Sequence, residues 1–137
     1  MASRSRSVWW RSRVGLVCVL LVEDDFLIRE VMAESLQDAG FEVLEADDGA
    51  AAVAFLRLSP ERFSILVTDF HMPGDIDGAH VASVARRGSA NLPVIIATGR
   101  PDILQARWQS ELGYQLLKKP YLPSQLLQLV RAAVGSS

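Results

Sequence analysis

Five short, mostly apolar runs alternate with segments of helical periodicity, and this alternation limits the folds that the chain can adopt. The runs are predicted strands at residues 14–22, 41–46, 64–68, 93–98 and 114–117. The predicted helices lie at residues 26–39, 49–58, 79–87 and 101–112 and from residue 123 onwards. Short apolar strands linked by helices indicate a parallel sheet that is covered on both faces. We therefore predict an α/β fold with one doubly wound, five-stranded parallel sheet.

Length and charge narrow the classes of function. The chain has 137 residues, enough for one domain. Residues 1–13 hold four arginines and no acid, so the remainder is acidic, which argues against direct nucleic-acid binding. The longest apolar run is too short to span a membrane, and Cys18 has no cysteine partner within the chain. We predict a disordered basic extension at 1–13, one domain at 14–137 and a cytoplasmic location.

Polar groups stand where several of the predicted strands end. Glu23 and Asp24 follow the first strand, and Asp69 follows the third. Thr98 ends the fourth strand, and Lys119 comes shortly after the fifth. With a strand order of 2-1-3-4-5, these ends are neighbours, and ligands of open α/β sheets bind at that edge. We therefore expect the five side chains to share one crevice.

These residue types suit phosphoryl chemistry around a metal ion. Three crowded carboxylates repel one another unless a cation joins them, and Mg²⁺ prefers such oxygen ligands. A lysine and a hydroxyl can bind phosphoryl oxygens, and an aspartate can accept the group covalently. Asp69 is the candidate acceptor because it stands between the acidic pair and the side of Thr98 and Lys119. Alternatively, the acids after the first strand only cap the helix that follows.

Four segments resemble the signature blocks of response-regulator receiver domains, the CheY-like family. They read VLLVEDD, ILVTDFHMPG, VIIATG and LLKKPY, in the family's order and spacing, and the resemblance covers residues 15–134. It implies a flavodoxin-like (βα)₅ fold and phosphorylation by a sensor histidine kinase or a histidine phosphotransfer protein. Asp69 would be the phosphoacceptor, Thr98 the switch hydroxyl and Lys119 the lysine that pairs with the phosphoryl group.

The same resemblance implies a Mg²⁺ site and a cis peptide bond. Asp24 and Asp69 would bind the metal directly, Glu23 would act mainly through water, and the backbone carbonyl of His71 would complete the protein ligands. The bond between Lys119 and Pro120 would be cis. The chain departs from the family pattern in two places. Leu116 stands where an aromatic switch residue is usual, and the loop after Asp69 is one residue longer, near Asp75.

The sequence thus predicts a single-domain response regulator. It would be a phosphoacceptor switch and not an enzyme, with at most self-catalysed phosphorylation and dephosphorylation. Output would pass to a protein effector or along a phosphorelay, from a monomer or a phosphorylation-dependent dimer, with no membrane span. Two alternatives stay open: a receiver domain cut from a hybrid histidine kinase, and a phosphorylation-independent binding module on the same fold.

Other enzyme classes fit the sequence less well. A phosphatase with an aspartyl nucleophile would want a second acid two residues after Asp69, where this chain has His71. A dinucleotide-binding enzyme would want a glycine fingerprint after the first strand, where this chain has an acid cluster.

Overall fold

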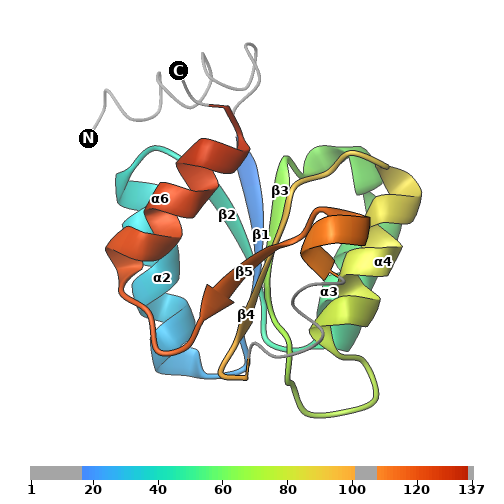
Figure 1. Cartoon of the computed structure of the whole chain (residues 1–137), viewed down its shortest axis with the longest axis horizontal. Helices are drawn as coiled ribbons and strands as arrows, with labels where there is room; N and C mark the ends of the chain where they lie inside the picture. Colours follow the sequence, from blue (N-terminus) through green and yellow to red (C-terminus); the bar gives the residue numbers. More distant parts are fainter. Residues whose placement is uncertain (1–16, 101–107, 136–137) are drawn as a thin grey trace.

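The computed structural model describes residues 17–100 and 108–135, whose strands form one parallel sheet (Figure 1). The strands are β1 (Cys18–Val22), β2 (Glu42–Ala46), β3 (Ile65–Asp69), β4 (Val94–Thr98) and β5 (Gln115–Lys118). They lie in the order β2-β1-β3-β4-β5, and every neighbouring pair is parallel. The predicted fold class and strand order are confirmed.

Two layers of helices cover the sheet. The α-helices of the described residues are α2 (Phe26–Asp38), α3 (Gly49–Leu58), α4 (Gly78–Gly88) and α6 (Pro123–Ala133). Figure 1 shows α2 and α6 on one face and α3 and α4 on the other. A short 3₁₀ turn, η1, spans Pro60–Arg62. Predicted boundaries for the α-helices agree with the observed ones to within about one residue.

One predicted helix, 101–112, is only partly described. Residues 101–107 lie outside the described residues, as does the basic extension at 1–13. The remaining part forms a π-helical turn, η2 (Trp108–Leu112), where an α-helix was predicted. The amide of Tyr114 donates to the carbonyl of Trp108 at 3.0 Å, and Gly113 between them has a φ of +68°. This hydrogen bond spans six residues, whereas the hydrogen bonds of an α-helix span four.

The sheet separates two apolar cores. Leu20 and Val22 of β1 belong to the core beneath α3 and α4, whereas Val19 and Leu21 belong to the core beneath α2 and α6. Every residue of β1, β3 and β4 is buried. Central strands of a two-sided sheet need apolar side chains on both faces, which explains why these strands read as uninterrupted apolar runs.

Three aspartates set the starts of helices at the carboxyl edge of the sheet. Asp25 caps α2 by accepting a hydrogen bond from the amide of Ile28 at 3.1 Å. Asp48 caps α3 and Asp77 caps α4 in the same way. A side-chain oxygen at this position satisfies an amide that the helix leaves unpaired. The caps therefore fix where each loop at this edge ends.

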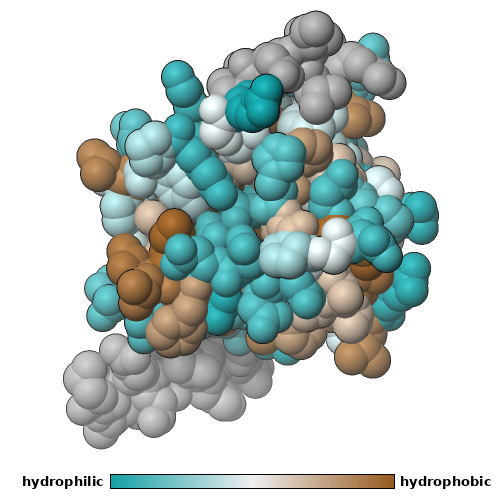
Figure 2. All heavy atoms as spheres, turned by 90° about the horizontal axis from the view of Figure 1, so that it is seen from below, coloured by the Kyte–Doolittle hydropathy of each residue, from teal (hydrophilic) through white to brown (hydrophobic). Residues whose placement is uncertain are grey.

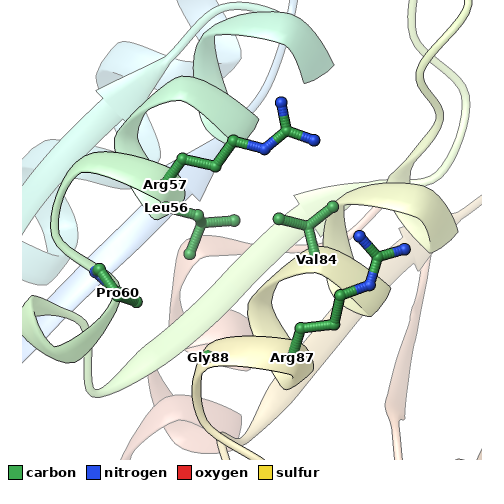
Figure 3. A pocket seen from close by; sticks show the side chains of 6 residues that line it. All are labelled: Leu56, Arg57, Pro60, Val84, Arg87 and Gly88. Atoms are coloured by element: carbon green, nitrogen blue, oxygen red, sulfur yellow. The ribbon is translucent and has the colours of Figure 1, made fainter.

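A shallow groove of about 260 Å³ lies between the C-terminal ends of α3 and α4. Figure 3 shows its lining residues, namely Leu56, Arg57, Pro60, Val84, Arg87 and Gly88. Leu56 and Val84 are only 3% and 8% exposed, so the groove offers little apolar surface to a ligand. Because the helices run antiparallel to the strands, it lies at the opposite end from the predicted site. No helix among the described residues has the length and apolar character of a membrane span.

Candidate functional site

Three acidic side chains converge at the carboxyl edge of the sheet. Glu23 and Asp24 follow β1, and Asp69 is the last residue of the adjacent strand β3. One carboxylate oxygen from each lies within 4.8 Å of the other two. Glu23 and Asp69 are buried, whereas Asp24 is exposed. Figure 2 views the molecule from this end and shows hydrophilic residues filling the middle of the face.

Lys119 directly follows β5, which β4 separates from β3, and its side chain reaches the acid cluster. Its Nζ lies 2.6 Å from Oδ1 of Asp69. Its backbone amide donates to the carbonyl of Thr98 at 2.9 Å, which fixes the start of the lysine beside the end of β4. The Lys119–Pro120 peptide bond is cis, as the family resemblance implies. The structure therefore brings Glu23, Asp24, Asp69 and Lys119 together, as the predicted strand order requires.

Burial sets the electrostatics of the cluster. Loss of contact with water raises the pKa of Glu23 above its ordinary range, and the neighbouring carboxyl group of Asp69 adds to the rise. Burial also raises the pKa of Asp69, which the ammonium group of Lys119 partly offsets. Both shifts arise because charged carboxylates lose hydration inside the protein. A cation bound among the acids would relieve this cost.

The donor set fits a hard divalent cation. Oδ2 of Asp69 is buried and has no hydrogen-bond partner among the described residues. Buried acceptors are nearly always paired with a protein group, a water or an ion. We therefore expect this oxygen to bind a water or an ion. Carboxylate oxygens are the ligands that Mg²⁺ takes in proteins. The cluster therefore has the chemistry that a magnesium site needs.

The two remaining predicted site residues, Thr98 and His71, differ in their exposure to solvent. Thr98 is buried at the end of β4, and its Oγ1 accepts a hydrogen bond from the amide of Arg100 at 3.1 Å. His71 is exposed in the loop after β3, and its ring lies edge-on to Phe70 with the centroids 4.5 Å apart. That the backbone carbonyl of His71 binds the metal stays a prediction.

Two residues that support the site were missed by sequence reasoning. Gly78 begins α4, and its amide donates to the carbonyl of Phe70 at 2.8 Å, which closes the loop after Asp69. Arg29 on α2 donates from Nη1 to the carbonyl of Glu23 at 2.7 Å. An Asp-Gly pair before a helical pattern was a usable signal for the first. The second depends on a tertiary distance that no motif reveals.

Comparisons with known proteins agree with this geometry. A family model described as the response regulator receiver domain matches residues 19–131. The response regulator protein FleR of Pseudomonas aeruginosa is 36% identical over 85% of this chain and 24% of FleR. The response regulator receiver protein CpdR of Brucella abortus is 38% identical over 75% of this chain and 84% of CpdR. A crystal structure of a response regulator receiver protein from Sinorhizobium medicae has a TM-score of 0.79 at 28% identity, covering 90% of this chain and 98% of that one.

The matches cover different shares of this chain and of its relatives. The chain spans about a quarter to a half of the length of several curated relatives, FleR included. The family match, by contrast, extends over most of this chain, from β1 into α6. The shared sheet order and the acid cluster at its carboxyl edge lie within the matched residues. The chain therefore belongs to the response regulator receiver domain family.

Proposed function

We propose that the chain is a two-component phosphoacceptor switch in which Asp69 receives the phosphoryl group. The observation that carries this assignment is the setting of Asp69. It is buried at the end of a central strand, 2.6 Å from the ammonium group of Lys119 and within an acid cluster. A sensor histidine kinase or a histidine phosphotransfer protein would be the donor.

The transfer is a displacement at phosphorus. A carboxylate oxygen of Asp69 forms the new bond to phosphorus while the donor's bond to phosphorus breaks, and the electron pair of that bond leaves with the donor. The Lys119 ammonium lies beside the carboxylate and balances charge on the phosphoryl oxygens. The Thr98 hydroxyl would donate a hydrogen bond to them. Water would later hydrolyse the acyl phosphate in a self-catalysed step.

A bound Mg²⁺ would neutralise negative charge on the phosphoryl group. Asp24 and Asp69 would hold it directly, Glu23 through water, and the carbonyl of His71 would supply a further ligand. The buried, unpaired Oδ2 of Asp69 supports this role. The chain's own part is to present these oxygens in a fixed arrangement at the end of β1 and β3.

Output would come from a shift between two conformations. Thr98 and Lys119 are joined by a backbone hydrogen bond, so contacts of both with a phosphoryl group would favour one arrangement of β4 and β5. Leu116, where the family usually has an aromatic residue, lies in β5 and packs against the core beneath α3 and α4. A downstream protein effector or a relay partner would recognise the favoured state. The chain itself would act as a monomer or as a phosphorylation-dependent dimer.

A small phosphodonor tests the proposal directly. With phosphoramidate and Mg²⁺, we expect the chain to gain the mass of one phosphoryl group, and hydroxylamine should remove it because the product is an acyl phosphate. Intact-protein mass spectrometry measures both. A chain that gains no mass under these conditions would favour the phosphorylation-independent binding module. A gain that resists hydroxylamine would point to a different acceptor.

We expect Mg²⁺ to raise the unfolding temperature, because it binds the native acid cluster and relieves carboxylate repulsion. At a hundred times its dissociation constant, a ligand of the native state adds about 2.7 kcal/mol. Asp24→Asn should reduce this shift strongly, and since Asp24 is exposed, the variant should fold normally. The control is Asp47→Asn, which changes an exposed acid after β2 at the same edge. Equal Mg²⁺ shifts in Asp24→Asn and the unsubstituted protein would contradict the metal assignment.

A further inference from the structure

The loop between β1 and α2 carries two of the three clustered acids, Glu23 and Asp24. Several hydrogen bonds hold it. The amide of Glu23 donates to the carbonyl of Ala46 at 3.1 Å, and Oε2 of Glu23 accepts from the amide of Asp25 at 3.0 Å. These bonds fix the start of the loop and the Glu23 side chain. They leave the direction of the peptide between Glu23 and Asp24 to be set by whatever binds the Glu23 carbonyl.

Arg29 binds that carbonyl. Its Nη1 donates to the Glu23 oxygen at 2.7 Å, while its Nε donates to Oε1 of Glu45 on β2 at 3.2 Å. Its backbone amide donates to the carbonyl of Asp25 at 2.9 Å. The side chain is only 14% exposed, and its guanidinium carbon lies 5.6 Å from the ring centre of Phe26. One guanidinium group thus joins the loop, α2 and β2.

We infer that Arg29 is a positioning residue for the metal site. The Glu23 carbonyl directly precedes Asp24, so holding it sets where the chain turns and where the Asp24 carboxylate stands. The guanidinium is planar with donors in fixed directions, and it can satisfy the carbonyl and Glu45 at once. Residues that hydrogen-bond to metal ligands directly usually change metal affinity by 10- to 100-fold when replaced. Arg29 acts through the neighbouring peptide, so we expect an effect at the lower end of that range. The inference rests on the proposed function, because it assumes that Mg²⁺ binds the acid cluster.

The positive charge of Arg29 has the opposite effect on the same affinity. A cation near the site repels Mg²⁺, although the ion pair with Glu45 offsets part of its charge. Removal of the charge alone would therefore tighten Mg²⁺ binding, whereas loss of the hydrogen bonds would weaken it. Because the signs differ, a substitution that keeps the charge separates the two effects. Lysine keeps the charge but lacks the planar fork.

The test measures Mg²⁺ dissociation constants for Arg29→Lys and Arg29→Ala by calorimetric titration of the full chain. We expect Arg29→Lys to bind Mg²⁺ about tenfold more weakly than the unsubstituted protein. Arg29→Ala should also bind more weakly, because lost positioning outweighs the lost charge. At saturating Mg²⁺, the rate of phosphoramidate labelling of Arg29→Lys should recover. Arg87→Lys, at an exposed arginine on α4, is the matched control and should leave the affinity unchanged.

Several results would overturn the inference. An unchanged affinity in Arg29→Lys, with reduced resistance to urea, would show a purely structural role. Tighter binding by Arg29→Ala would show that the charge dominates. Labelling that stays slow at saturating Mg²⁺ would show a disturbance beyond the metal site. A lack of Mg²⁺ binding by the unsubstituted protein would instead refute the proposed function, and this inference with it.

Discussion

Asp69→Asn is expected to abolish phosphoryl transfer to this chain, from one group per molecule to none. A carboxylate oxygen can attack phosphorus and form an acyl phosphate, whereas the neutral amide of asparagine is a poor nucleophile and forms no such product. The ammonium group of Lys119 would remain in place, but no phosphoryl group would be attached beside it for its charge to balance. Mass spectrometry after incubation with phosphoramidate and Mg²⁺ measures the difference.

The variant should remain folded, so loss of labelling can be read as loss of the acceptor. Asparagine has nearly the same shape as aspartate, and it removes the desolvation cost that raises the pKa of Asp69. Lys119 loses its ion pair but is 34% exposed, so its ammonium group can turn to water. Circular dichroism checks the fold, and Asp47→Asn should be labelled like the unsubstituted protein. Labelling that persists in Asp69→Asn would identify a different acceptor and remove the assignment.

The sheet could be predicted from the sequence because its central strands are buried on both sides. Apolar runs at 64–68 and 93–98 correspond closely to β3 and β4. The strand ends were less predictable. Asp69 and Lys118 belong to strands, although their polarity suggested that the strands had already ended. Their pairing with Ala97 and Thr98 continues the ladder, and backbone pairing does not depend on side-chain polarity.

The site was predictable only as far as topology determines it. Strand order places the carboxyl ends of β1, β3 and β5 at one edge, and the structure brings Glu23, Asp24, Asp69 and Lys119 together there. Their roles in phosphoryl transfer stay predictions. The bridge made by Arg29 could not be foreseen, because in the sequence it is one more charged residue on an amphipathic helix. Such contacts depend on distances between elements, which periodicity does not encode.

Gly78→Ala is expected to lower the free energy of unfolding by about 3 kcal/mol, as overpacking against rigid neighbours does. A Cβ atom at Gly78 would overlap the backbone carbonyl oxygen of Asp69 and lie 2.9 Å from Cα of Phe70. Backbone cannot swing aside as a flexible side chain can. The start of α4 would have to move away from the end of β3, weakening the 2.8 Å hydrogen bond from Gly78 to the Phe70 carbonyl. Urea denaturation measures the loss.

The same displacement should slow phosphoramidate labelling, because it shifts the strand end that carries Asp69. Gly99→Ala is the matched control for stability. A Cβ atom there would meet no heavy atom of the described residues within 4 Å, and Gly99 is not at a positive φ. Its free energy of unfolding should change by less than about 0.5 kcal/mol. If Gly78→Ala were as stable as Gly99→Ala, the end of β3 would be able to move aside and make room for the added Cβ atom. Asp69, the proposed phosphoacceptor, would then not be held by close contact between α4 and the sheet.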